Sequence, residues 1–412
     1  HNKMAHQSAT KCVYIDQGID ASTGAVNSPI YQSAGFSYPN PEDLEKVFAG
    51  QEYGYVYSRI SNPTITDLER RISYIEGGLG CVAVSSGLSA IFSLALVLAQ
   101  SGQTIVVSDS LFGGTRDLFQ ETIPKLGVDV KFVDMSQPDH VVNLIDANTA
   151  FVFTEIISNP KLVVPNLQVI SNATSQHGVP FVVDTTLTGA VGFNAKEHGV
   201  DIVVHSSTKL FASNGGAVGG VIIDTGLFNW KQSKHPELQQ AASNVHRFAF
   251  LERVRRHALN NGGFNTSPMN AYFTMLGLET LALRYGKICE NALAVAQFFD
   301  NKKVNVSYPG LDTHPQHDLA QSYFNGGFGP LLTIDLGSKQ AAFAFISKLK
   351  IVQNMSNLGD NRTMVIHPKS TIYAKHTPEQ LDQAGVTDGL IRINVGIEDI
   401  NDLINEFTEA LK

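Results

Sequence analysis

The sequence predicts an α/β fold in which a large domain holds a mostly parallel sheet and a smaller α+β domain follows. Three observations predict it. Short runs rich in β-branched residues alternate with segments long enough for a helix, which is typical of parallel sheets covered on both faces. Strand-like runs and a final helical segment follow a long helical stretch. A chain of 412 residues also has room for two or three domains.

Residues 1–65 are rich in Gly, Pro, Ser and Tyr and show weak periodicity, so we expect an extended N-terminal arm. One short helix is expected at 41–49. Pro41 stands in its first turn, and Glu42 and Asp43 follow, which suits the start of a helix.

Residues 66–262 carry the alternating pattern, and we expect them to form the large domain. The uncharged stretch 77–108 contains many Ser and Gly residues, so a buried strand, a turn and a buried helix fit it better than a membrane span. Residues 227–263 are expected to be helical, with their arginines on a solvated face. The strands are expected at 81–84, 104–109, 130–134, 150–155, 180–185, 201–206 and 218–224.

Residues 263–412 are expected to form the smaller domain. The pattern predicts one long helix over 267–300, strands at 331–336 and 390–395, and a last helix at 400–411. His314 and His317 are spaced like metal ligands, but no third ligand is in view, so we expect no metal.

Composition excludes several classes of protein. The net charge of −8 argues against a partner that is nucleic acid or an anionic membrane. The three cysteines lie far apart without a C-x-x-C pair, which indicates a reducing compartment without disulfides or zinc. No secretion signal is recognisable, so we expect a cytoplasmic protein.

One group of residues suggests a specific chemistry. Lys209 follows the strand expected at 201–206, and Asp184 ends the strand expected at 180–185. Because ligands bind beyond the carboxyl ends of such strands, both should face one site. A pyridoxal phosphate enzyme needs an amine for its Schiff base and a carboxylate for the pyridine nitrogen.

The phosphate of such a cofactor could lie at the turn Ser85-Ser86-Gly87. This turn separates a strand-like run from an apolar helix, and Gly87 lets the backbone approach an anion closely. Ordinary helix capping explains the same turn. The turn, Asp184 and Lys209 together, in this order along the chain, favour a cofactor site over simple helix capping.

With these residues in view, the chain resembles the transsulfuration, or Cys/Met metabolism, family of pyridoxal phosphate (PLP) enzymes of fold type I. The resemblance runs from about residue 10 to the C-terminus. It rests on the motifs YGYVYSRISNPT, LERRISYIEGG, SSGLSAI, LFGGT, VDTT, VVHSSTK, GLETLALR and GLIRINVGIEDI, in family order.

The resemblance implies a role for each motif residue. Lys209 would form the Schiff base and Asp184 would pair with the ring nitrogen. Tyr57 and Arg59 would reach the phosphate of a neighbouring subunit, so that a dimer is the catalytic unit of a homotetramer. Arg392 would take the substrate carboxylate, although a structural ion pair would explain it too. By the same resemblance, Asn159 would contact the phenolic oxygen of the cofactor and Phe112 would stack on its ring. The phosphate would be bound by Ser86, Gly87, Leu88, Ser206 and Thr208, and the substrate by Asn357 and Ser370.

The implied activity is γ-replacement on O-acetylhomoserine by sulfide or a small thiol. Asn357 and the segment TEIISNPKL favour the O-acetylhomoserine sulfhydrylase branch. Two alternatives stay open: a γ-lyase acting on methionine, homocysteine or cystathionine, and replacement by a carbon or nitrogen nucleophile.

The chain departs from the family on the substrate side. Phe112 replaces the usual stacking tyrosine, which would be a catalytic residue, and Tyr57 or Tyr373 could supply the missing hydroxyl. Ile372-Tyr373 and the segment DTTLTGAVGF, beginning at Asp184, also differ from the family pattern.

Overall fold

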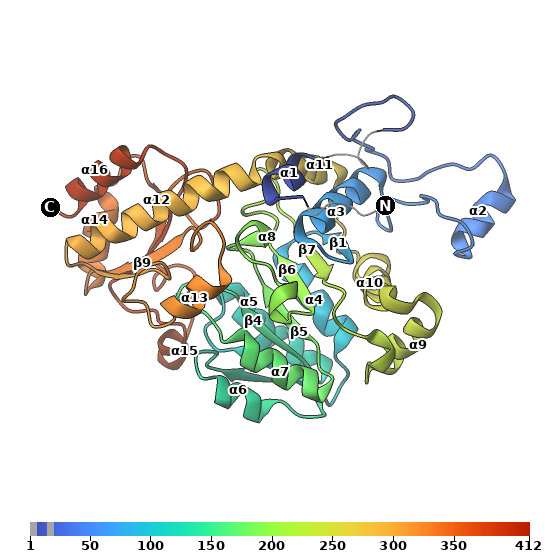
Figure 1. The fold of residues 1–412 in the computed structure, drawn as a ribbon, viewed down its shortest axis with the longest axis horizontal. Helices are drawn as coiled ribbons and strands as arrows, with labels where there is room; N and C mark the ends of the chain where they lie inside the picture. Colours follow the sequence, from blue (N-terminus) through green and yellow to red (C-terminus); the bar gives the residue numbers. More distant parts are fainter. Residues whose placement is uncertain (1–5, 15–19) are drawn as a thin grey trace.

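A computed structural model describes residues 6–14 and 20–412; residues 1–5 and 15–19, which belong to the predicted arm, lie outside the described residues. Two sheets organise the chain. A seven-stranded sheet comes from residues 80–224, and a five-stranded sheet comes from residues 305–394. Figure 1 shows the second sheet and its helices beside the first, joined by the long helix α12 (Leu281–Asn301).

The seven-stranded sheet has the strand order β1-β7-β6-β5-β4-β2-β3. The five strands from β6 to β3 run parallel, and β7 is antiparallel to both of its neighbours, so the expected mostly parallel sheet is present. The strands are β1 (Gly80–Val84), β2 (Thr104–Ser108), β3 (Asp129–Val133), β4 (Thr149–Glu155), β5 (Phe181–Asp184), β6 (Ile202–His205) and β7 (Gly220–Asp224).

Both faces of this sheet are buried, as its near-continuous apolar strands require. In β6, Val203 packs toward a core that includes α3, α7 and α11, whereas Val204 packs toward α4 and α10 on the other face. The covering helices are α3 (Pro63–Glu76), α4 (Gly87–Leu98), α5 (Gly113–Asp117), α6 (Pro138–Leu144), α7 (Leu167–His177), α8 (Gly189–Gly192), α9 (Pro236–Val245), α10 (Ala249–Val254) and α11 (Pro268–Glu279).

Two expected helices are interrupted. The segment 227–263 is not one helix: a 3₁₀ turn, Trp230–Gln232, precedes α9, a second, His246–Phe248, separates α9 from α10, and a π-helix, Arg255–Asn261, follows. The helix expected at 267–300 is two helices, because the backbone at Thr280 leaves helical geometry between α11 and α12. Pro236, at the first position of α9, marks an interruption within 227–263 in the sequence, whereas no Pro or Gly stands at the Thr280 break.

The five-stranded sheet has the order β10-β11-β12-β9-β8. The sequence predicted β9 and β12; the other three strands have two or three residues each and were missed. Helix α12 packs against α8 near the first sheet and against β8, β9 and α16 of the second part. The remaining elements are β8 (Asn305–Ser307), α13 (His317–Tyr323), β9 (Leu331–Asp335), α14 (Lys339–Ser347), β10 (Gln353–Asn354), β11 (Met364–Ile366), α15 (Pro378–Gln383), β12 (Leu390–Asn394) and α16 (Ile400–Ala410).

The N-terminal segment contains α1 (Ser8–Val13) and the expected short helix, α2 (Pro41–Phe48). Helix α1 packs on α3, α11 and α12, whereas α2 stands away from the body of the molecule (Figure 1). Phe48, the last residue of α2, is 70% exposed, and the nearby Tyr53 is 75% exposed. This segment therefore presents aromatic surface to its surroundings.

The uncharged stretch 77–108 forms β1, α4 and β2, as expected. In the ranges that the structure describes, no helix combines the length and apolarity needed to span a membrane. The domain limits after residues 65 and 262 stay a prediction.

Candidate active site

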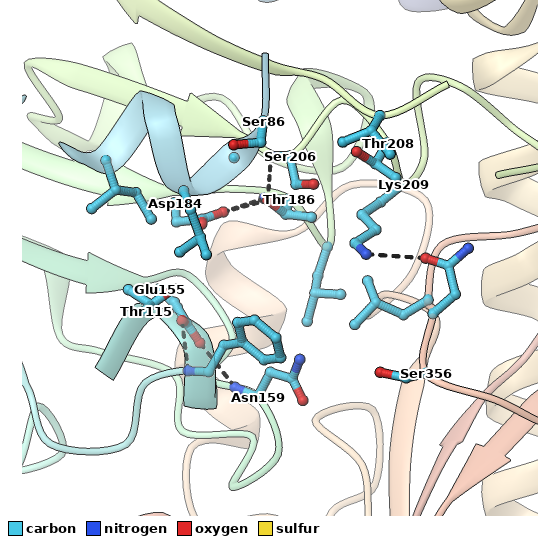
Figure 2. Close-up of a pocket in the computed structure, with 18 of the residues that line it drawn as sticks. Ser86, Thr115, Glu155, Asn159, Asp184, Thr186, Ser206, Thr208, Lys209 and Ser356 are labelled. Carbon is cyan, nitrogen blue, oxygen red and sulfur yellow. Dashed lines mark hydrogen bonds between the residues drawn. The ribbon is translucent and has the colours of Figure 1, made fainter. Parts of the chain in front are cut away.

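A cavity of about 540 Å³ lies at the carboxyl edge of the seven-stranded sheet, facing residues 355–358 and β12 (Figure 2). The strands β4, β5 and β6 end there, because parallel strands place their carboxyl ends at one edge. The cavity gathers eleven of the residues that the sequence singled out: Ser86, Gly87, Leu88, Phe112, Asn159, Asp184, Ser206, Thr208, Lys209, Asn357 and Arg392.

Lys209 enters the cavity from the turn that follows β6. Its Nζ donates a hydrogen bond to Asn357 Oδ1 at 3.0 Å. Burial and, to a smaller extent, the nearby charge of Arg392 lower the pKa of Lys209 to about 8 against the opposing charge of Asp184. A lysine with this pKa can both accept and donate a proton near neutral pH.

Asp184 ends β5 and points into the same space (Figure 2). Its Oδ1 accepts hydrogen bonds from the backbone N–H of Thr186 at 2.9 Å and from the Thr186 hydroxyl at 2.5 Å. Within the described chain Oδ2 accepts no hydrogen bond and stays available to a ligand. Burial raises the pKa of Asp184, and the Thr186 hydrogen bonds and the charges of His205 and Lys209 lower it. A cationic N–H group in the cavity would stabilise the ionised form.

The start of α4 forms an anion cup. Ser86 caps the helix by accepting from Ser89 N, which leaves the first backbone N–H groups, of Gly87 and Leu88, without an acceptor in the described part of the chain. The Ser206 hydroxyl beside them also lacks a protein partner there. A Cβ on Gly87 would lie 2.9 Å from Ser206 Cβ, so only glycine allows this approach. Free N–H groups at a helix N-terminus bind phosphate.

Thr208 lines the cup, but its hydroxyl already exchanges hydrogen bonds with the backbone of Gly219.

Glu155 is a site residue that the sequence reasoning missed. It ends β4 opposite Asp184 in the strand register, and its two carboxyl oxygens accept from Phe112 N and Asn159 N, each at 3.0 Å. Burial, followed by the charge of Asp184, raises the pKa of Glu155 to about 8. The signal was present, because Glu155 is a polar residue at the end of an expected strand.

Phe112 lines the cavity at the start of α5, where the family has a tyrosine. Tyr373 does not replace its hydroxyl. Tyr373 is buried, and its Oη lies 3.1 Å from the Leu111 carbonyl and 3.3 Å from the Asn159 carbonyl. The Tyr373 proton is therefore directed at main-chain acceptors and away from the cavity.

Arg392 reaches the cavity from β12 and is 3% exposed. Its Nη1 donates to Asn159 Oδ1 and its Nη2 to the Asn357 carbonyl, both at 3.2 Å. Both partners are neutral oxygens, so among the described residues Arg392 is not held in a structural ion pair, the alternative that the sequence left open. Burial lowers the pKa of Arg392 to about 10. A carboxylate entering the cavity would therefore meet a desolvated cation that forms no ion pair within residues 6–14 and 20–412.

Three expected site residues lie elsewhere in this subunit. Ser370 is exposed, and its hydroxyl lies 2.7 Å from Nδ1 of the buried His367, so the structure does not place it among the cavity residues. Tyr57 is 45% exposed, and the guanidinium of Arg59 lies over its ring. The hydrogen-bonded turn from Pro368 to Tyr373 leaves Ser370 exposed while Tyr373 is buried.

The residues present fit pyridoxal phosphate. Lys209 offers an amine of lowered pKa, and Asp184 offers an oxygen that accepts no hydrogen bond from the described residues. The start of α4 offers an anion cup in which Gly87 lies too close to Ser206 for a side chain. Among the described residues, no three His, Cys, Asp or Glu side chains come together as metal ligands.

Comparisons with known proteins agree with this fit. Residues 9–412 match the family model described as Cys/Met metabolism PLP-dependent enzyme. Homocysteine synthase of Schizosaccharomyces pombe is 38% identical over 97% of both chains. O-acetyl-L-homoserine sulfhydrylase 1 of Thermus thermophilus is 37% identical over 93% of this chain and 94% of its own.

A crystal structure of a putative O-acetylhomoserine (thiol)-lyase from Campylobacter jejuni superimposes with a TM-score of 0.93 at 30% identity, covering 98% of this chain and all of the other. That structure carries a pyridoxyl-lysine-5'-monophosphate. The fold predicted from the sequence, a fold type I cofactor domain followed by a smaller domain, is confirmed. The chain belongs to the Cys/Met metabolism family of PLP-dependent enzymes.

Proposed function

We propose that this enzyme replaces the γ-substituent of O-acetyl-L-homoserine with sulfide or a small thiol, giving homocysteine or a related amino acid. The observation that carries the proposal is the convergence of Lys209, Asp184 and Arg392 on one cavity. Relatives over nearly the whole chain are named homocysteine synthase and O-acetyl-L-homoserine sulfhydrylase.

The three residues that converge on the cavity have separate roles. Arg392 binds the substrate carboxylate and thereby directs the α-carbon toward Lys209. Lys209 takes the α-proton and shuttles it, which its pKa of about 8 permits. Asp184 holds a proton on the pyridine nitrogen. When bound, pyridoxal phosphate supplies an electron sink for the charge that develops on the substrate.

The other contacts are proposed from their positions. Phe112 offers a ring face for stacking, and Asn159, held in place by Glu155 and Arg392, contacts the phenolic oxygen. The phosphate is bound by Ser86, Gly87, Leu88, Ser206 and Thr208, and Asn357 contacts the amine of Lys209.

The direct test is to incubate the holoenzyme with O-acetylhomoserine, with and without sulfide, and to identify the products. Homocysteine formed only with sulfide supports replacement. 2-Oxobutanoate and ammonia formed at the same rate in both samples would show a γ-lyase instead. If O-acetylhomoserine disappears in neither sample, carbon and nitrogen nucleophiles are tried next.

Phe112 bears on the choice between replacement and thioether cleavage. Neither its ring nor the buried Tyr373 hydroxyl offers a proton donor to the cavity. Acetate leaves without protonation, whereas a thiolate leaving group gains from a donor. We expect Phe112→Tyr to raise cystathionine cleavage relative to O-acetylhomoserine turnover. Equal changes in both rates would limit Phe112 to stacking.

We further infer that the N-terminal segment completes the cavity of a second subunit. Residues 48–57 expose several aromatic side chains, and Tyr57 and Arg59 stack on one another outside their own cavity. A dimer is then the catalytic unit of a homotetramer. Mixing inactive Arg59→Ala and Lys209→Ala proteins should restore part of the activity. No recovery from a mixture shown to exchange subunits would contradict the shared site.

We also propose the cytoplasm as the compartment of this enzyme. Cys12, Cys81 and Cys289 are all free and buried, as is usual for proteins kept in reducing surroundings.

A further inference from the structure

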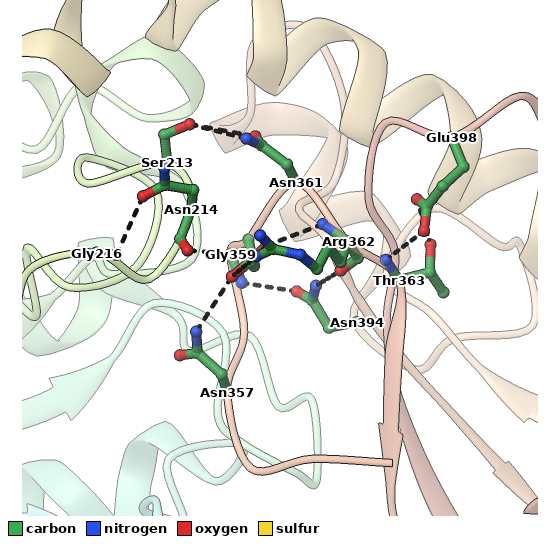
Figure 3. Close-up of polar contacts among 11 residues, drawn as sticks. Ser213, Asn214, Gly216, Asn357, Gly359, Asn361, Arg362, Thr363, Asn394 and Glu398 are labelled. Atoms are coloured by element: carbon green, nitrogen blue, oxygen red, sulfur yellow. Dashed lines mark hydrogen bonds and ion pairs between the residues drawn. The ribbon is translucent and has the colours of Figure 1, made fainter. Parts of the chain in front are cut away.

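Residues 357–362 form a polar chain (Figure 3), and Asn357 at one end of it contacts the Lys209 amine. Asn357 presents its Oδ1 to Lys209 Nζ at 3.0 Å and its Nδ2 to Asp360 Oδ2 at 3.4 Å. Asp360 is 2% exposed. Its Oδ1 accepts from the backbone N–H of Arg362 at 3.0 Å and from Arg362 Nη1 at 2.9 Å.

We propose that Asp360 is a positioning residue, which fixes the amide of Asn357 so that its oxygen, and not its nitrogen, faces the Lys209 amine. An amide can turn by 180° and exchange the positions of its oxygen and nitrogen. A carboxylate accepts hydrogen bonds only. Asp360 therefore favours the orientation in which Nδ2 points toward it and Oδ1 points toward Lys209.

The surrounding backbone is shaped around this contact. Gly359 has a φ of +65°, and a Cβ there would lie 2.9 Å from Leu210 N and 3.0 Å from Lys209 Cβ. Gly215 has a φ of +71°, and a Cβ there would lie 3.2 Å from both Asn357 Nδ2 and Asp360 Oδ2. The positive φ favours glycine at both positions, and the short distance to Leu210 N requires it at Gly359. These two glycines bring the turn against Lys209 and the 213–216 loop over the amide–carboxylate pair.

The same turn is tied to the substrate side. Arg362 Nη1 also contacts the Asn214 carbonyl at 3.3 Å, and Gly359 N donates to Asn394 Oδ1 at 2.7 Å, two residues beyond Arg392 on β12. The backbone carbonyl of Asn357 accepts from Arg392. Asn357 thus contacts the amine with its side chain and the carboxylate-binding arginine with its main chain, and Asp360 sets which end of the side chain the amine meets.

This arrangement has a measurable consequence for Lys209. A hydrogen bond from the ammonium to an amide oxygen favours the charged form, whereas a facing amide nitrogen would disfavour it. Asp360→Asn should therefore lower the pKa of Lys209 by about one pKa unit, which from a starting pKa of about 8 corresponds to an about fivefold rise in neutral amine at pH 7.

The readout is the pH dependence of acetic anhydride labelling of Lys209 in the full-length, cofactor-free protein, followed by mass spectrometry of its peptide. Asn357→Ala should lower the labelling midpoint by a similar amount, and it serves if Asp360→Asn does not fold. Asp388→Asn is the charge-matched control, because Asp388 is exposed and pairs with Lys369. Its midpoint should equal that of the original protein.

A double variant separates positioning from a simple charge effect. If Asp360 acts through the Asn357 amide, Asp360→Asn should have no further effect in the Asn357→Ala background. A persisting shift there, or an unchanged midpoint in both folded single variants, would overturn the proposal. The inference rests on the proposed role of Lys209, but the labelling needs neither substrate nor turnover. Its failure is therefore distinguishable from failure of the O-acetylhomoserine assay.

Discussion

The two walls of the cavity are built in different ways. On one wall, Glu155 and Asp184 end neighbouring parallel strands, and Lys209 follows the next strand. The other wall consists of the segment 355–358 and one strand residue, Arg392, from the second sheet. The first wall follows from sheet topology, whereas the second depends on contacts between distant segments.

The walls also differ in charge. The strand-end wall holds two buried acids with raised pKa values, and the opposite wall supplies a buried arginine whose partners are neutral. Lys209 lies between them, and its pKa is lowered by the charge of Arg392 and raised by the charge of Asp184. We infer that the strand-end wall binds the cofactor and the opposite wall binds the substrate. Four variants can break or sharpen this division.

Lys209→Ala should have the largest effect, because Lys209 serves both walls. We expect turnover to fall by about 10³-fold or more, since proton transfer by a positioned side chain is worth about 10²–10⁴-fold. Steady-state rates with O-acetylhomoserine and sulfide measure this. Lys348→Ala, which removes an exposed lysine, is the control and should keep full activity. Turnover of Lys209→Ala at the original rate would remove the lysine from the mechanism.

Glu155→Gln should change how the stability of the cofactor-free protein depends on pH. The pKa of Glu155 is raised from 4.5 to about 8 in the fold, so its contribution to stability is complete below about pH 4.5 and is lost as the pH rises through 8. In the wild-type protein this lowers the free energy of unfolding by a few kcal/mol between these pH values, and the neutral glutamine should remove that pH dependence.

The measurement for Glu155 is the melting temperature of both proteins between pH 5 and pH 8.5. The difference between the two curves cancels the effects of the other buried acids. Parallel curves would show that Glu155 is ionised throughout and does not carry the pH dependence of this wall.

Asp184→Asn should retain the cofactor but reduce turnover at least about tenfold. A neutral amide cannot keep the pyridine nitrogen protonated, and a charge-assisted hydrogen bond is worth roughly 1.5–3 kcal/mol. The matched control is Asp201→Asn, a buried acid at the opposite edge of the sheet whose Oδ2 accepts from Phe181 N. A similar loss of turnover in both variants would indicate a structural role.

Arg392→Lys should act mainly on substrate binding. Lysine cannot form the two parallel hydrogen bonds that a guanidinium offers to a carboxylate. We expect the KM for O-acetylhomoserine to rise about tenfold with a smaller change in kcat. An unchanged KM together with a lowered melting temperature would make Arg392 a structural residue.

The difference between the walls explains what the sequence could predict. Lys209, Asp184 and the Gly87 turn were found because their positions follow from strand order and local turn chemistry. Glu155 obeys the same rule and could have been found by inspecting every polar strand end. The break at Thr280 was missed because no Pro or Gly stands there, whereas Pro236 signalled an interruption within 227–263 that was not used.

The second wall could not be predicted from local pattern. The contact between Lys209 and Asn357 joins residues 148 positions apart, and that between Arg392 and Asn159 joins residues 233 apart. Only the family resemblance pointed to Arg392 and Asn357. The same resemblance placed Ser370 at the substrate, whereas the structure turns its side chain to the surface.

The central claim is that both walls surround a pyridoxal phosphate bound to Lys209. The most direct measurement is to reduce the purified holoenzyme with borohydride, digest it and identify the modified peptide by mass spectrometry. We predict a pyridoxyl phosphate mass on Lys209, and its absence from Lys209 in a sample displaced with a competing amine before reduction. A modified lysine elsewhere in the chain, with Lys209 unlabelled, would contradict the account.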